Sequence, residues 1–154
     1  MNVKRTVVVS GAVALVLSWS AWGIADAAKG GAAVFVAASD VKWSDVPGAP
    51  GIQMARLDGD PAKGPSHFLL KFAGGFSAPL HHHTADHSVT VVAGTLVLDV
   101  DGKAQKLPAG SFFTFSQMKR HATRCEAGAD CVLSMDVRGA WDVVPEEGTA
   151  SAKK

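Results

Sequence analysis

Five of the six histidines in this chain of 154 residues lie in one arrangement that could bind a metal ion. His81, His82 and His83 are consecutive, His87 follows after three residues, and His121 lies further downstream. Side chains at i and i+2 of an extended strand share a face, so His81 and His83 can point to one place while His82 points away. Neutral imidazole is the commonest protein ligand for borderline transition metals. The sequence therefore predicts a metal site formed by His81, His83, His87 and His121.

Two simpler explanations would account for the histidines without a specific metal site. A histidine tract at the surface can bind metal incidentally, and core histidines can simply satisfy hydrogen bonds. The flanking glycines, the later His121 and the strand-like segments around the cluster favour a specific site. His82 is expected to face solvent or the rim of the site. His67, outside the arrangement, is expected at the surface of a strand.

The spacing resembles the first motif of the cupin family, which reads Gly, five residues, His-x-His, three or four residues, Glu, six residues, Gly. Gly75 and Gly94 flank the histidines at those distances, and His87 stands at the glutamate position. Four imidazoles around a divalent ion would leave a net charge of about +2, whereas three imidazoles and a carboxylate would leave about +1. Histidine in place of glutamate at position 87 also removes a carboxylate that could accept a proton near the metal. Asp86 and Asp136 are expected to point away from the site.

A looser resemblance to the second cupin motif follows. The stretch from Leu107 to Gly110, with a Phe-rich run after it, is similar to the glycine turn and strand of that motif. The segment from Ser116 to Arg120 replaces the usual Pro-Ala-Gly before His121. The resemblance covers roughly residues 71–143 and is closest to small bacterial exported single-domain cupins. It implies an all-β fold, a single RmlC-like jelly-roll barrel following an N-terminal signal peptide.

The resemblance also implies a function. A cupin of this kind would bind one divalent transition metal (zinc, iron, manganese, nickel or copper) and act on a small molecule as a dioxygenase, decarboxylase or isomerase. One of the basic residues Lys119, Arg120 and Arg124 at the mouth of the pocket would favour an anionic substrate. The alternative is a non-catalytic sensing or structural module that binds a metal or a small ligand, with the four imidazoles closing the metal site. The sequence contains no second catalytic signature, and so only the metal is expected to do chemistry.

Short strand-like segments separated by Gly, Pro and Asp turns are typical of an all-β barrel or sandwich. The expected strands are residues 52–57, 67–72, 89–93, 95–100, 104–107, 112–115, 121–125, 132–137 and 141–144. Asp101-Gly102 is the strongest hairpin signal. The side chains expected in the interior are Phe68, Leu70, Phe72, Val89, Val91, Phe113 or Phe115, Leu133, Met135 and Val137. The expected organisation is a signal peptide over 1–27, N-terminal strands and loops packing on the barrel over 28–60, the barrel over 61–145, and a disordered tail over 146–154.

The first thirty residues have the pattern of an export signal. Lys4 and Arg5 precede an apolar run from Val7 to Ile24, and Ala25-Asp26-Ala27 is a small-x-small cleavage pattern. Cleavage after Ala27 would give a periplasmic or secreted protein. The competing interpretation is an uncleaved membrane anchor, because the apolar run approaches the length of a span.

Removing residues 1–27 would take the positive residues from 15 to 13 and the negative residues from 14 to 13, which leaves a net charge of zero. That balance gives no reason to expect a nucleic-acid partner or stable membrane association after cleavage. The sequence leaves open whether the protein is a monomer or a homodimer.

Cys125 and Cys131, the only two cysteines, bracket a short Gly-containing segment. In an oxidising compartment they are expected to form a disulfide across a hairpin. A reactive thiol pair or additional metal ligands are the alternatives, but this is not a redox spacing.

Overall fold

The computed structural model describes residues 33–146 of the chain. The signal peptide expected over 1–27, and the expected tail apart from Glu146, lie outside the described residues. Within residues 33–146, no helix is long and apolar enough to cross a membrane. The only helical element in that range is the short 3-10 turn η1 (Ala38–Asp40).

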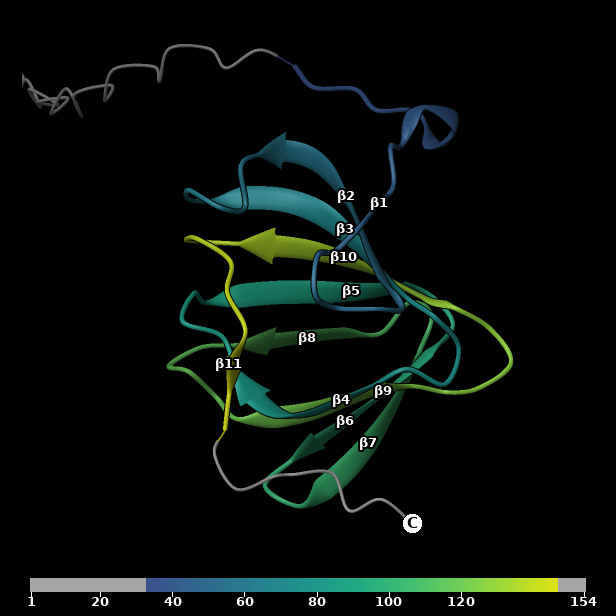
Figure 1. The fold of residues 1–154 in the computed structure, drawn as a ribbon, viewed down its shortest axis with the longest axis vertical. Helices are drawn as coiled ribbons and strands as arrows, with labels where there is room; N and C mark the ends of the chain where they lie inside the picture. The colour runs from purple at the N-terminus through teal and green to yellow at the C-terminus, as the bar shows by residue number, and fades with distance from the viewer. Residues whose placement is uncertain (1–32, 147–154) are drawn as a thin grey trace, which may run out of the picture. The chain divides into compact units, whose positions relative to one another are not determined.

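Two antiparallel sheets face one another (Figure 1) and make the jelly roll that the sequence predicts. The six-stranded sheet has the order β1 (Ser44–Asp45), β2 (Ile52–Gly59), β3 (Ser66–Phe72), β10 (Cys131–Val137), β5 (His87–Ala93) and β8 (Phe112–Phe115). The five-stranded sheet has the order β11 (Val144–Pro145), β4 (Ser77–His82), β9 (His121–Cys125), β6 (Thr95–Val100) and β7 (Lys103–Pro108). Residues 52–59, expected to pack on the barrel, are thus a strand of its larger sheet.

The core lies between the sheets and follows the period-two alternation of the strands. On β3, Phe68, Leu70 and Phe72 are buried while His67 is exposed and hydrogen-bonds Ser134 at 2.9 Å. The expected core residues are confirmed, with Phe115 buried and Phe113 packed against the core. The buried cluster consists of Phe68, Leu70, Phe72, Val89, Val91, Leu96, Leu98, Phe115, Cys125, Cys131, Leu133, Met135 and Val137.

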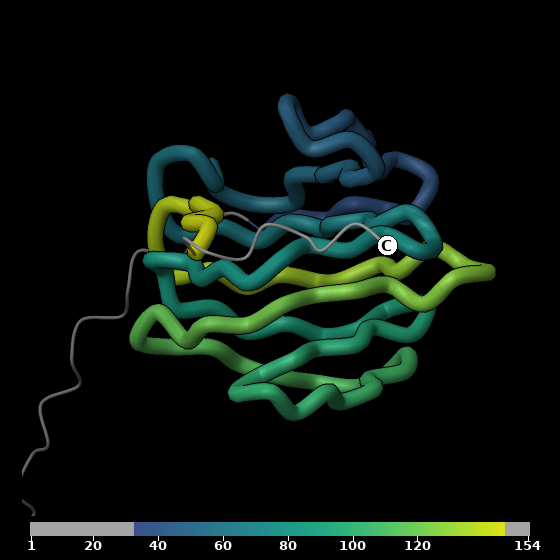
Figure 2. Tube along the Cα trace, turned by 60° about the horizontal axis from the view of Figure 1, so that its bottom comes forward, coloured from purple at the N-terminus to yellow at the C-terminus, as the bar shows by residue number. Residues whose placement is uncertain are grey.

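The last strand differs from expectation. Only Val144 and Pro145 are in β11, which pairs with His82 and His81 of β4, so a strand over 141–144 was the wrong assignment. The end of the described chain, drawn in yellow, lies at one end of the barrel (Figure 2). Trp141 and Asp142 precede β11 and contact the histidines instead. Their position is set by packing against a distant part of the chain, which local periodicity does not report.

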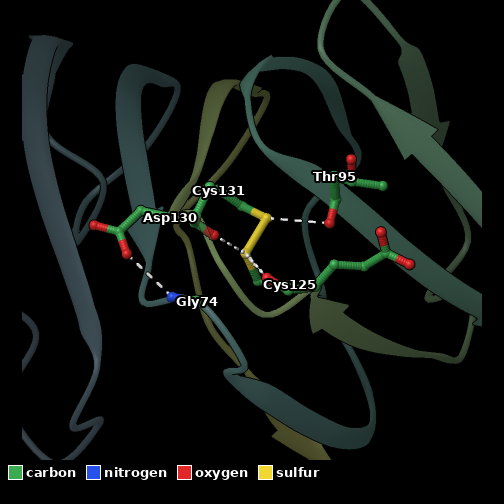
Figure 3. Close-up of a disulfide and its surroundings, with 7 residues drawn as sticks. Gly74, Thr95, Cys125, Asp130 and Cys131 are labelled. Carbon is green, nitrogen blue, oxygen red and sulfur yellow. Dashed lines mark hydrogen bonds between the residues drawn. A yellow bond between two sulfur atoms is a disulfide. The ribbon is translucent and has the colours of Figure 1, made fainter.

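Cys125 and Cys131 form the expected disulfide, shown in Figure 3, with Cα atoms 5.8 Å apart. The expectation that it spans a hairpin was wrong, because β9 and β10 do not pair and belong to different sheets. The segment between the cysteines crosses from one sheet to the other, so the bridge joins the two sheets at that end of the barrel.

Gly94, in the turn between β5 and β6, lies directly against this crossover. It has a φ of +75°, and a Cβ built there would lie 2.5 Å from the Asp130 carbonyl oxygen and 2.9 Å from the Cys131 Cα. Only glycine fits both the backbone conformation and the contact. The glycine at this motif position is therefore required by the packing of the two sheets.

Candidate metal centre

Strands of both sheets bring the four predicted ligands to one cavity. His81 on β4 and His121 on β9 are direct cross-strand partners in the five-stranded sheet. His83 follows the end of β4, and His87 begins β5 in the six-stranded sheet. All four side chains are buried, with 3–7% of their surface exposed.

Three of the four form a tight cluster. The ring nitrogens of His81, His83 and His121 that could bind an ion all lie within 4.8 Å of one another. His87 is not in this three-residue cluster, although its ring centroid is 4.9 Å from that of His83 and it lines the same cavity. The structure therefore brings three of the predicted ligands together and puts the fourth beside them.

Each of the four imidazoles has its Nδ1 next to a backbone carbonyl oxygen. The acceptors are Pro79 for His81 at 2.7 Å, Asp142 for His83 at 2.5 Å, Ala85 for His87 at 3.0 Å and Lys119 for His121 at 3.0 Å. Because a carbonyl oxygen only accepts, these contacts put the proton on Nδ1 and leave the Nε2 lone pair unprotonated. Metal-binding histidines commonly donate a hydrogen bond in this way from the ring nitrogen that does not bind the metal. The residues present therefore fit a metal ion.

Burial keeps these histidines neutral. It lowers the pKa of His83 to about 3 and that of His121 to about 4, and it also lowers the pKa of His81 and His87. The neighbouring imidazoles act in the same direction, since two positive rings would repel each other. Neutral imidazole is the form that binds a metal, so no proton has to be displaced near neutral pH.

Trp141 and Asp142 are site residues that the sequence analysis missed. The indole ring of Trp141 stacks on His83, with ring centroids 3.9 Å apart, and meets His87 edge-on at 5.1 Å. The carboxylate of Asp142 accepts hydrogen bonds from the Thr84 amide at 2.8 Å and the Thr84 hydroxyl at 2.6 Å. Neither residue is part of a recognisable motif, and no signal in the sequence links them to the histidines.

Asp142 is also the acidic residue among the described residues that line the cavity. Burial raises the pKa of its carboxyl, but the hydrogen bonds from Thr84 outweigh this and lower it overall. The two expected outward carboxylates do lie outside the cavity. Asp136 is exposed, and Asp86 accepts a hydrogen bond from the Gln117 amide at 3.1 Å.

His82 faces away from the cluster, as strand alternation predicts. Its Nδ1 lies 2.6 Å from the carboxylate of Glu146, which also pairs with Arg120 at 3.0 Å. Lys119 pairs with Asp101 at 2.7 Å. Among the described residues, none of those lining the cavity is Lys or Arg. Lys119, Arg120 and Arg124 are therefore not part of its lining.

The cavity next to the cluster has a volume of about 310 Å³. Its walls come from both sheets and from the segments around β1 and β11. Apart from the histidines, Thr123 and Asp142, the lining residues are apolar. A small molecule in this space would lie against the imidazoles.

A family model described as Domain of unknown function (DUF4437) matches residues 35–153. The chain belongs to this family. The DUF4437 chain has the cupin fold, as its likeness to solved structures shows. A comparison with curated protein sequences finds no match.

The similar structures share little sequence with the DUF4437 chain. The polyketide cyclase RemF from Streptomyces resistomycificus is 22% identical, with a TM-score of 0.60, over 73% of this chain and 87% of that one. KdgF from Halomonas sp. is 22% identical, with a TM-score of 0.58, over 70% and 94%. An RmlC-like cupin from Ralstonia eutropha is 24% identical, with a TM-score of 0.60, over 72% and 71%. Identities this low establish the fold alone.

Proposed function

We propose that His81, His83 and His121, with His87 as the fourth ligand, hold one divalent transition metal ion. We further propose that the protein is a metal-dependent enzyme that acts on a small molecule in the adjoining cavity, as a dioxygenase, decarboxylase or isomerase. The observation that carries the proposal is the convergence of buried imidazoles whose Nδ1 atoms all face backbone carbonyls. That arrangement favours a specific metal site over the two simpler explanations, which are a surface histidine tract and core histidines that only satisfy hydrogen bonds.

The roles of the residues follow from their contacts. A divalent ion bound by imidazoles would act as a Lewis acid toward an oxygen atom of the substrate. The carbonyl oxygens of Pro79, Ala85, Lys119 and Asp142 hold the imidazoles in the tautomer that presents Nε2. Trp141 covers the face of the His83 ring and keeps water from that side of it. An all-imidazole ligand set suits zinc, iron, manganese, nickel or copper.

The cavity favours an enzyme over a module whose metal site is closed and structural. A structural metal site is closed by its four protein ligands and gains nothing from an open space beside it. Here a space of about 310 Å³ adjoins the histidines. That is within the size range, roughly 300–1,000 Å³, of sites that bind small molecules.

Export to the periplasm or the medium is also part of the proposal. The basic start, apolar run and small-x-small pattern of residues 1–27 support it, and so does the Cys125–Cys131 disulfide, since such bonds persist in oxidising compartments. The mass of the exported protein is expected to match a chain that begins at or within a residue of Ala28. A mass for residues 1–154 in the membrane fraction would indicate an anchor.

The metal centre is tested by comparing His121→Ala with His82→Ala. Both remove one imidazole from neighbouring strands, but only His121 belongs to the cluster. Metal affinity, measured by competition with a chelator, is expected to fall at least tenfold in His121→Ala and to change little in His82→Ala. Equal effects of the two variants would contradict the proposed ligand set.

The choice between enzyme and closed module is tested on the manganese-loaded protein. Water-proton relaxation is expected to detect at least one exchangeable water on the ion, since catalysis needs an open coordination position. A manganese-loaded protein without such a water would favour the sensing or structural module.

A further inference from the structure

Away from the histidines, most of the residues that line the cavity are apolar. Phe72 and Phe76 stack with ring centroids 5.0 Å apart, and both line it. The thioethers of Met54 and Met135 lie on the same wall, and methionine adapts well to aromatic rings. Such a wall stabilises an apolar guest and offers a sugar or a dicarboxylate no partners for its polar atoms.

The apolar character extends to the edge of the cavity. Val46 and Ala49, before β2, and Val143, before β11, line the cavity and are partly or largely exposed, with 56% of the Val143 surface open to solvent. Lys119 and Arg120, the cations closest in sequence to His121, are held in ion pairs by Asp101 and Glu146. A guest with an anionic group would therefore meet no Lys or Arg among the described lining residues, in which Asp142 is the charged side chain.

One neutral hydrogen-bonding side chain interrupts this wall. Thr123 lies two residues after His121 on β9, so its side chain shares the inward face. It is 7% exposed and lines the cavity. Its hydroxyl has no hydrogen-bond partner among residues 33–146, and a ligand oxygen is a natural partner for it.

We infer that the cavity takes a small molecule with an apolar body, the size of one or two fused aromatic rings, whose polar atoms lie together at the end that meets the histidines and Thr123. The volume of about 310 Å³ accommodates a small ring system. The inference rests on the proposed function in one respect, namely that the end next to the histidines is the end that reacts. Thr123 is then a residue that selects for an oxygen on the ligand.

The test is calorimetric titration of the full chain with phenol, 2-naphthol, naphthalene and oxalate. Each titration is run on metal-free and on zinc-loaded protein, with the metal content of every sample measured. The metal-free protein is expected to bind 2-naphthol at least tenfold more tightly than phenol, because the second ring buries more apolar surface. It is expected to bind oxalate more weakly than 2-naphthol.

Two pairs of variants locate the binding. Met54→Gln introduces an amide into the wall and should weaken 2-naphthol binding several-fold, whereas Met118→Gln, at an exposed methionine outside the cavity, should not. Thr123→Val should weaken 2-naphthol about five- to tenfold and leave naphthalene unchanged, whereas Thr123→Ser should retain the preference for 2-naphthol.

The inference is overturned if 2-naphthol binds no more tightly than phenol, if oxalate binds the metal-free protein more tightly, or if Met54→Gln and Met118→Gln behave alike. A chain that binds no metal but shows the ring preference and its dependence on Thr123 would refute the proposed metal centre and support the cavity inference. A chain that binds zinc but lacks the ring preference would support the proposed metal centre and refute the cavity inference.

Discussion

The imidazole of His87 sets the charge and the ligand count of the proposed centre. It points into the cavity, donates from Nδ1 to the Ala85 carbonyl oxygen, and packs edge-on against Trp141 and Phe115. It is thus held as a ligand would be, next to the tight cluster of the other three. With four neutral ligands, the proposed centre would keep the full charge of a divalent ion, about +2. Such a centre would be more electrophilic than a centre in which one ligand is a carboxylate.

His87→Ala is expected to weaken metal binding at least tenfold, about as much as His83→Ala, because one imidazole is lost from a preorganised set. His87→Glu is expected to retain the metal and to lower the charge of the centre by one. Chelator competition measures the affinity, and metal analysis of the purified variants measures the occupancy. If His87→Ala binds metal as well as the parent protein while His83→Ala does not, the centre is made of three histidines.

The burial of the histidines also makes the stability of the metal-free protein depend on pH. In the unfolded chain these groups protonate near pH 6.5, whereas folding lowers the pKa of His83 to about 3 and that of His121 to about 4. Between those values the unfolded state binds more protons than the folded state. The free energy of unfolding should therefore fall as the pH falls from about 6.5 to about 4, by up to about 1.4 kcal/mol per pH unit for each histidine.

Urea denaturation of the metal-free protein at neutral pH and near pH 5 measures this slope. His121→Gln should make the slope shallower, because it removes one of the buried groups that titrate. His67→Gln is the matched control, since it removes an imidazole that is exposed on the outer face of β3 and lies outside the buried cluster. A slope unaffected by His121→Gln would contradict the assignment.

At the scale of elements, the end of the described chain holds the histidine segment in place. Trp141 stacks on His83, Asp142 binds both His83 and Thr84, and β11 pairs with β4 at His81 and His82. The carboxylate of Glu146 then binds His82. A short segment with little regular structure of its own therefore fixes the orientation of the loop between β4 and β5.

Asp142→Ala is expected to lower metal affinity about tenfold and the free energy of unfolding by about 1–2 kcal/mol. The Thr84 amide and hydroxyl lose their acceptor, and the loop that carries His83 loses its anchor. Asp136→Ala is the matched control, because Asp136 is an exposed aspartate on the outer face of β10, and it should change stability by less than about 0.5 kcal/mol. Chelator competition and urea denaturation measure the two effects, and equal losses of metal affinity in both variants would exclude the anchoring role.

At the scale of the whole molecule, two features connect the sheets. The histidines come from β4, β5 and β9, and thus from both sheets, while the disulfide joins β9 to β10 where each lies next to the crossover. His121 is the first residue of β9 and Cys125 the last, so the two connections lie at opposite ends of that strand.

Replacing both cysteines, Cys125→Ala with Cys131→Ala, is expected to lower the free energy of unfolding by roughly 2 kcal/mol. The bridge closes a small loop, with a sequence separation of 6, and so removes limited entropy from the unfolded chain. Denaturation with and without reductant measures the effect. Reductant should destabilise the parent protein and leave the double variant unchanged, and a double variant as stable as the parent would show that the bridge contributes little.

The sequence predicts the parts of this fold that depend on local alternation. Phe68, Leu70 and Phe72 are buried and His67 is exposed because β3 is a regular strand with one face toward the core. The boundaries of β6, β8 and β9 match the expectation residue for residue. Alternation also separates His82 from its two neighbours.

Features that depend on distant contacts were not predictable. Of β4, only an extended backbone at the histidines was expected, because Pro79 interrupts the strand-like residues before them. The structure adds a shift of register between Ala78 and His81. Trp141 and Asp142 reach the histidines only because the chain returns across them about sixty residues later. The disulfide was predicted as a pair, but its placement between sheets follows from a crossover that the spacing of two cysteines does not encode.

The distribution of the histidines over both sheets has a consequence for when the metal enters. His81 and His121 meet as soon as β4 and β9 pair, but His87 joins them only when the six-stranded sheet has closed over the other. The complete set of proposed ligands comes together only once both sheets have packed, so we expect the metal to be acquired late in folding. We therefore expect the ions present where folding finishes to influence which metal is taken up, because imidazole ligands suit several of the candidates.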